Sequence, residues 1–153
     1  MASNPVDPGY AERVRASFAR QSAMDTIGAR LLEVEPGRVV IELAHRDSLT
    51  QQHGFIHAGI VATALDSACG YAAATLMPAD AGVLTIEFKI NLLAPARGPV
   101  LRLEGLVTKA GRTITVADGR AWQPHPSKAG EQQLMATMSA TLMTVTGRDN
   151  VRH

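Results

Sequence analysis

The chain has 153 residues, of which 46% are hydrophobic and 19% charged, and its 15 basic and 14 acidic residues give a formal net charge of +1. This length predicts a single domain spanning 1–153, and the evenly spread charges lack the basic patch that a nucleic-acid partner requires. The single cysteine, Cys69, excludes an internal disulfide. Because the N-terminal residues also lack the apolar core of a secretory signal, we expect a cytoplasmic protein.

The first predicted element is a short amphipathic helix at about residues 8–21, which Asp7 precedes as a cap. Two strands are predicted next, at 26–34 and 38–44. The turn Pro36-Gly37 joins them, and its tightness indicates a hairpin.

The Ala-rich segment Ala58–Met77 is predicted to form one long helix, which is apolar on nearly all sides. About 20 apolar residues can cross a membrane. Here Asp66 interrupts the run, and the aromatic and basic anchors typical of membrane interfaces are missing from its ends, so we expect no membrane contact.

After this helix the pattern becomes that of strands, and the segment 83–93 alternates apolar and polar residues with a period of two. The alternation predicts one apolar face made of Leu84, Ile86, Phe88, Ile90 and Leu92. Three further strands are predicted at 99–111, 112–123 and 133–145, followed by a frayed tail at about 147–153. The element order predicts an α+β domain in which a five- to six-stranded antiparallel sheet wraps around the long helix.

Asp66 is the most unusual residue of the long helix, because an unpaired buried carboxylate costs several kcal/mol or more. At about 100° per residue, it shares its side of the helix with small residues such as Gly59 and Gly70, where a slim ligand could approach. One interpretation is a satisfied structural carboxylate. We favour the other, a general base or nucleophile in a partly desolvated setting.

The helix begins with the sequence His57-Ala58-Gly59, where free backbone amides and the positive end of the helix dipole can bind an oxyanion. Such donors suit acyl transfer, although ordinary capping explains the same residues. The Ala58 amide and Asp66 are eight residues apart, about 12 Å along the axis, so one carbonyl cannot touch both. Two copies with antiparallel helices would close this gap, which predicts a homodimer with shared sites.

The stretches QQHGFIHAGIVATALD and IEFKINLLAPA together resemble the hot-dog thioesterases of the phenylacetate-degradation (PaaI-like) type. The resemblance implies a hot-dog fold, hydrolysis of acyl-CoA thioesters, and a dimer that is commonly doubled to a tetramer. It assigns Asp66 as nucleophile or general base and the Ala58 amide as the donor to the thioester oxygen, at a position where the family usually has Gly. Gln51 corresponds to an Asn or Gln that helps to position the thioester or water in relatives. Thr85 lies near the position of a Ser or Thr whose hydroxyl some relatives use to place water.

We expect His57 to shape the entrance beside Gly59, and a basic rim to bind the phosphates of coenzyme A. The candidates for this rim are Lys109, Arg112, His125 and Lys128. The histidines and carboxylates lack paired ligand spacing, so no metal is expected, and the only coenzyme is the one carried by the substrate. Two alternatives remain open: a hot-dog dehydratase, which the His57–Asp66 interval disfavours, and a non-catalytic acyl-CoA-binding module.

Overall fold

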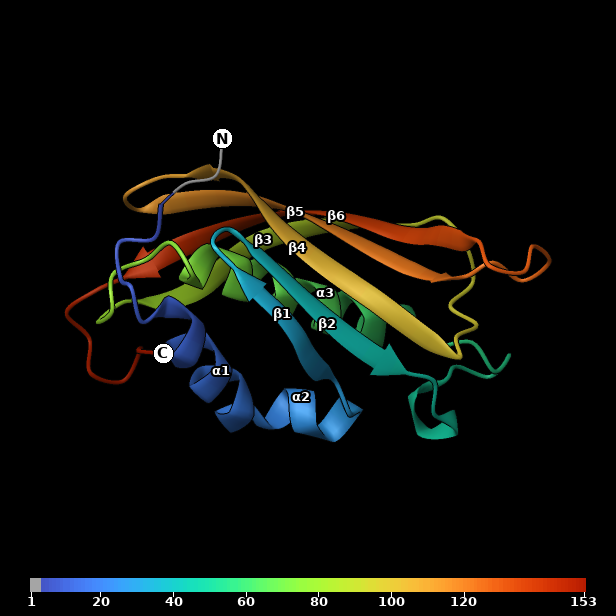
Figure 1. Cartoon of the computed structure of the whole chain (residues 1–153). Helices are drawn as coiled ribbons and strands as arrows, with labels where there is room; N and C mark the ends of the chain where they lie inside the picture. The colour runs from blue at the N-terminus through green and yellow to red at the C-terminus, as the bar shows by residue number, and fades with distance from the viewer. Residues whose placement is uncertain (1–3) are drawn as a thin grey trace.

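The computed structural model describes residues 4–153, in which two helices and a hairpin precede a third helix and four further strands (Figure 1). The helices are α1 (Tyr10–Arg20), α2 (Ser22–Ile27) and α3 (Ala58–Ala74), with a short 3-10 turn η1 (Asp47–Leu49). The strands are β1 (Arg30–Glu35), β2 (Arg38–Ala44), β3 (Gly82–Leu92), β4 (Val100–Ala110), β5 (Ile114–Pro124) and β6 (Gln132–Val145).

The strands form one antiparallel sheet in the order β1-β2-β4-β5-β6-β3, which leaves β1 and β3 at its edges. The sheet curves over α3, while α1 and α2 lie below the edge strand β1 in the view of Figure 1, and the ring of Phe18 on α1 packs against that of Tyr71 on α3. This arrangement confirms the predicted α+β fold, with six strands around a central helix.

The position of α3 against the sheet depends on two glycines. A Cβ added at Gly105 would lie 2.3 Å from the backbone of Ala68, and one added at Gly119 would lie 2.9 Å from the side chain of Leu65. Gly105 and Gly119 are direct partners across β4 and β5. Because neither has a side chain, α3 can lie close to the middle of the sheet.

In the edge strand β3, the apolar and polar residues do not each keep to one face, as the sequence pattern predicted. The pairing with β6 shifts by one residue between Thr85 and Glu87, which marks a β-bulge. Before the bulge, Val83 packs against the core and the Thr85 hydroxyl reaches Asp66 on α3; after it, Ile90 packs against the core. The prediction of a single apolar face along the whole strand is therefore wrong. A bulge adds one residue, so side chains before it and after it that share the same period-two phase point to opposite sides of the sheet.

The ends of the chain also differ from the prediction. The first strand begins at Arg30 instead of Thr26, because α2 continues to Ile27 and ends at Gly28, whose φ of 74° is left-handed. At the other end, His153 is half-buried and its Nδ1 lies 2.9 Å from the Ser17 Oγ on α1. His153, in the tail that was predicted to fray, thus contacts α1.

A membrane-spanning helix must be both long and apolar. Within residues 4–153, no helix has both the length and the apolar composition that a crossing needs.

Candidate active site

Asp66 lies halfway along α3 on the side that faces β3. Its Oδ1 accepts a 2.8 Å hydrogen bond from the Thr85 Oγ1. Burial raises the pKa of Asp66 above its ordinary value, and the bond from Thr85 opposes this only in part. Asp66 is half-buried while Thr85 is exposed, so the pair is open to the outside of the protomer along the sheet edge.

A small hollow of about 80 Å³ adjoins Asp66, and its other lining residues include Gln21, Tyr71 and His153. The Gln21 Oε1 accepts a 3.0 Å hydrogen bond from the Ser67 Oγ. Burial, together with the nearby charges of Arg13 and Arg20, lowers the pKa of His153 to about 4. The hollow is thus lined by neutral polar groups beside one carboxylate.

The N-terminus of α3 presents one unoccupied backbone donor. His57 is the N-cap residue, and its Nδ1 accepts a 2.9 Å hydrogen bond from the Gly59 amide. The Ile60 and Val61 amides bond to the His57 carbonyl. Among the hydrogen bonds of residues 4–153, none uses the Ala58 N–H, so this amide is available to a ligand.

A cavity of about 550 Å³ opens in front of this amide and is called here the entrance cavity. Its walls are Val61, Met135 and two segments of the chain: Gln51 and Gln52 with Phe55 to Ala58, and Leu92 to Ala96 at the end of β3. Gln51 lines it, and the Gln51 Oε1 accepts a hydrogen bond from the His53 amide, which leaves the amide NH₂ group of that side chain as a further donor.

Within one protomer, the two parts of the candidate site are separate. Ala58, His57 and Gln51 line the entrance cavity, whereas Asp66 and Thr85 line the small hollow. The eight residues between Ala58 and Asp66 correspond to about 12 Å of helix. A single chain therefore does not bring the two groups of predicted site residues together.

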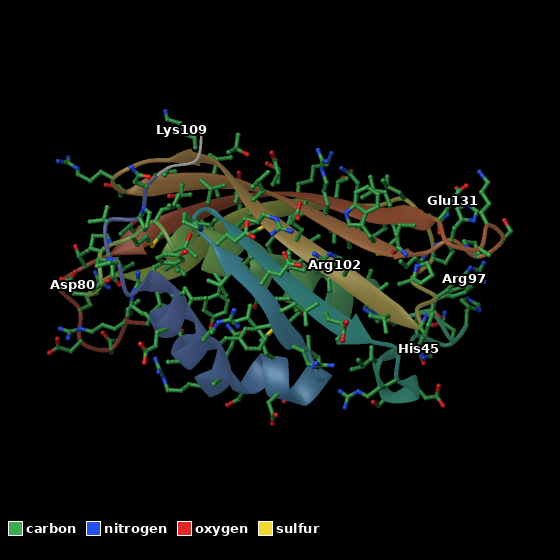
Figure 2. All side chains as sticks on the ribbon, viewed as in Figure 1. His45, Asp80, Arg97, Arg102, Lys109 and Glu131 are labelled. Carbon is green, nitrogen blue, oxygen red and sulfur yellow. The ribbon has the colours of Figure 1, made fainter. Side chains whose placement is uncertain are left out.

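The structure places the four predicted basic residues at two opposite ends of the sheet. Figure 2 shows Lys109 at one end with Asp80, and Glu131 at the other end with Arg97 and His45. Arg112 follows the β4 strand that ends next to Lys109, and lines a different cavity of about 390 Å³. Lys128 lies in the same turn as Glu131, 3.9 Å from its carboxylate.

His125 and Cys69 have local structural contacts. The His125 Nδ1 accepts a 3.1 Å hydrogen bond from the Ser127 amide, which fixes the β5–β6 turn. Cys69 is buried, and this burial, with the charges of Asp66 and Asp118, raises its pKa to about 12. A thiol that stays protonated is a poor nucleophile. Across residues 4–153, no group of three or more His, Cys, Asp or Glu side chains is arranged to hold a metal ion.

Two residues next to the entrance cavity were missed by the sequence analysis. Gln123 is only 1% exposed, and its side chain bonds to the backbone of the segment 95–98. Arg97 lies in that segment, with its guanidinium carbon 4.9 Å from the centre of the Phe55 ring. The signal for Arg97 was its position, since it is the only charged residue in the stretch LLAPARGP.

Comparison with known proteins agrees with this architecture. The structure of a thioesterase family protein from Silicibacter pomeroyi is 53% identical, covers 91% of this chain and 100% of that chain, and has a TM-score of 0.86. The PaaI protein of the Escherichia coli phenylacetic acid degradation operon, at 16% identity, shares the fold with a TM-score of 0.77 over 90% of this chain and 94% of its own.

Curated relatives match over 64–76% of their own lengths. One of them, the 1,4-dihydroxy-2-naphthoyl-CoA hydrolase of Listeria monocytogenes, is 27% identical over 65% of this chain and 76% of its own. The family model described as Thioesterase superfamily matches residues 53–129, which include the α3 entrance, Asp66 and β3. These matches confirm the resemblance to hot-dog thioesterases, and the chain belongs to the Thioesterase superfamily.

Proposed function

We propose that this protein hydrolyses acyl-CoA thioesters, with an aryl or short- to medium-chain acyl group, to the free acid and coenzyme A. The observation that carries the proposal is the pair of half-sites on α3. One presents an unoccupied amide at the helix N-terminus, and the other presents a partly desolvated carboxylate on an open edge. Membership of a thioesterase family supports the reaction class.

The Ala58 N–H is the proposed donor to the thioester oxygen. As the carbonyl carbon becomes tetrahedral, negative charge develops on this oxygen, and a fixed amide at the positive end of a helix stabilises it. The His57 Nδ1 holds the neighbouring Gly59 amide, so His57 keeps the first turn of α3 in place. The Gln51 amide group, on the wall of the same cavity, orients the thioester or the attacking water.

Asp66 is the proposed nucleophile or general base. As a base, it takes a proton from water while the water oxygen attacks the carbonyl carbon. As a nucleophile, it forms an acyl anhydride that water then cleaves. In both cases the C–S bond breaks, the coenzyme leaves as a thiolate, and this sulfur is then protonated. Thr85 orients the carboxylate through its hydroxyl.

A homodimer would combine the two half-sites. The edge strand β3 lies next to Asp66, and several large apolar side chains of this strand and of the residue after it are exposed in a single chain: Leu84, Ile86, Phe88, Leu92 and Leu93. A second copy is the proposed cover, because β3 pairs with β6 along only one of its edges. With a two-fold axis at this edge, Asp66 of one protomer meets the Ala58 amide of the other.

A tetramer of two such dimers is the larger assembly we propose. Leu84, Met143 and Ile114 are register partners across β3, β6 and β5, and all three are exposed. This row extends the apolar surface onto a second area of the sheet, which a second dimer could cover.

The assignment of Asp66 is tested by measuring CoA release from a panel of aryl and fatty acyl-CoAs with the wild type and the Asp66→Asn variant. Asparagine keeps the shape and can still accept the Thr85 hydrogen bond, but it cannot take a proton. We expect kcat to fall by about 10²–10⁴-fold. Equal rates in the two proteins would rule out the assigned role.

Shared sites are tested by mixing two inactive proteins. Ala58→Pro removes the proposed donor with little strain, because proline is tolerated in the first turn of a helix and the His57 ψ of 138° suits a residue before proline. Refolding Ala58→Pro together with Asp66→Asn yields mixed dimers in which one site is intact. We expect activity to reappear in the mixture, whereas a mixture as inactive as its parents would contradict the shared site.

A further inference from the structure

The proposed reaction requires a place for the nucleotide of coenzyme A, and this inference rests on that proposed function. If the thioester oxygen binds the Ala58 amide, the pantetheine arm would lead outward through the entrance cavity and place the phosphates at its mouth. Apart from His57, no ionisable side chain lines this cavity within the described part of the chain. An ionic partner for the phosphates must therefore lie at the rim.

Arg97 is at this rim. It follows Ala96, which lines the entrance cavity, and its guanidinium lies 4.9 Å from the centre of the Phe55 ring, which lines the same cavity. Figure 2 shows Arg97 at the same end of the molecule as His45, whose ring nitrogen contacts the carbonyl of Gly54 in the entrance loop.

The buried side chain of Gln123 holds the backbone of Arg97 in place through hydrogen bonds. The Gln123 Oε1 accepts hydrogen bonds from the amides of Arg97 (2.9 Å) and Gly98 (3.3 Å), and its Nε2 donates to the Pro95 carbonyl at 2.9 Å. The Ala96 carbonyl accepts from the Ile56 amide at 2.9 Å, which ties this segment to the residues just before α3. The backbone that carries Arg97 is therefore tied both to β5 and to the residues that lead into α3.

The charge of Arg97 is not used elsewhere in the described residues. None of the ion pairs or hydrogen bonds of residues 4–153 involves its guanidinium, which is exposed and stacked on an aromatic ring. By contrast, Lys128 at the same end lies near the Glu131 carboxylate. A guanidinium that is already oriented loses little entropy on binding, and its planar group matches two phosphate oxygens.

We propose that Arg97 binds a phosphate group of the coenzyme A nucleotide at the mouth of the entrance cavity, and so favours CoA thioesters over thioesters that lack the nucleotide. Phe55 orients the guanidinium by stacking, and Gln123 positions the backbone that carries it. Arg97 is thus a substrate-binding residue remote from the reacting carbonyl, and it affects KM more than kcat.

The test compares Arg97→Gln with the wild type on one acyl group attached to four carriers: CoA, dephospho-CoA, pantetheine and N-acetylcysteamine. Glutamine keeps much of the length and the polarity but removes the charge. We expect the KM for the acyl-CoA to rise about tenfold, as for the loss of a charge-assisted hydrogen bond, with kcat within about twofold. KM for the pantetheine and N-acetylcysteamine thioesters should not change.

The dephospho-CoA thioester identifies the phosphate. If its KM in the wild type equals that of acyl-CoA in Arg97→Gln, the 3′-phosphate is the partner. If Arg97→Gln still raises its KM, the partner is the diphosphate. Either result supports the proposal, since both require a phosphate contact at Arg97.

The matched control is Arg30→Gln, which removes an exposed arginine from β1, at the sheet edge opposite β3. Its kinetics should equal those of the wild type. The proposal is overturned if Arg97→Gln changes all four thioesters equally, or leaves the preference for CoA over pantetheine unchanged, or is matched by Arg30→Gln.

A binding measurement separates this proposal from the proposed function. Calorimetric titration with free CoA should show weaker binding to Arg97→Gln than to the wild type. If the wild type hydrolyses no acyl-CoA but binds CoA in this Arg97-dependent way, the proposed function fails and the phosphate site stands. If hydrolysis is observed without dependence on Arg97, only the phosphate site fails.

Discussion

At the scale of single residues, the burial of Asp66 that suits its proposed role in catalysis also lowers the stability of the fold. Its folded pKa lies above the ordinary value of 3.8, chiefly because burial disfavours the charged form. The native state therefore holds the proton more tightly than the unfolded state. Below the ordinary pKa both states are protonated and there is no penalty. As the pH rises from there through the raised folded pKa, ionised Asp66 increasingly lowers the free energy of unfolding.

We therefore expect Asp66→Asn to unfold at a higher temperature than the wild type at about pH 7, where Asp66 is ionised. The difference should shrink as the pH falls toward the ordinary pKa of Asp66, and circular dichroism melts across this range measure it. Thr85→Val provides the contrast, because it removes the hydrogen bond to the carboxylate and should lower the melting temperature. A wild type that is more stable than Asp66→Asn at neutral pH would contradict this account.

The same shift predicts the pH dependence of the activity. The proposed base or nucleophile must be ionised, so kcat/KM should fall as the pH decreases through the raised pKa of Asp66. The acid limb of the profile should lie above the pH at which an ordinary aspartate titrates. An acid limb at the ordinary pKa of aspartate would show that Asp66 is not desolvated in the active enzyme.

At the scale of secondary-structure elements, the contact between α3 and the sheet requires a residue without a side chain at Gly105. The Cβ of Gly105→Ala would lie 2.3 Å from the backbone of Ala68, and backbone atoms cannot rotate away. We expect this variant to lose at least about 1–3 kcal/mol of unfolding free energy, as overpacked cores do. Chemical denaturation measures this loss.

The control for this prediction is Gly70→Ala, within α3 itself. There the added Cβ would have only ordinary contacts, 3.9 Å from the nearest side-chain atoms, and alanine favours a helix by about 1 kcal/mol over glycine. Gly70→Ala should be neutral or stabilising. If both substitutions destabilise the fold equally, close packing of α3 on β4 is not what Gly105 provides.

At the scale of the whole molecule, two exposed apolar positions distinguish the two proposed interfaces. Phe88, 43% exposed on the edge strand β3, belongs to the proposed dimer contact, whereas Ile114, 41% exposed on β5, belongs to the proposed contact between dimers. We expect Phe88→Lys to give monomers whose activity is at least about 100-fold lower, because Asp66 no longer meets a partner's Ala58 amide. Ile114→Lys should give dimers that stay active.

Sedimentation velocity and CoA release, measured on the same samples, test this pair of variants. A fully active monomer of Phe88→Lys would show that one protomer contains a complete site. Loss of activity in a dimeric Ile114→Lys protein would show that the exposed row of Leu84, Met143 and Ile114 takes part in the reaction.

The sequence alone predicted the class of fold, the strand 38–44, the central helix and the family, and the structure and the comparisons confirm these. Each depends on a local or periodic pattern. A continuous apolar run forms a buried helix, and alternating residues form strands. The stretch from Gln51 to Asp66, taken together with the following strand that ends in Pro95-Ala96, is specific enough to identify hot-dog thioesterases. Asp66 was identified as a candidate because a charged carboxylate in such an apolar run is destabilising unless it has polar partners.

Only the tertiary structure decided which groups meet. The bulge in β3 is an irregularity of pairing with β6, and it turns Thr85 toward Asp66 against the period-two pattern. Arg97 and Phe55 lie 42 positions apart in the sequence, as their numbers show, yet they stack at the rim of one cavity. Periodicity reports which side of its own element a residue occupies. Contacts between distant segments depend on how the elements pack, and no local pattern encodes this.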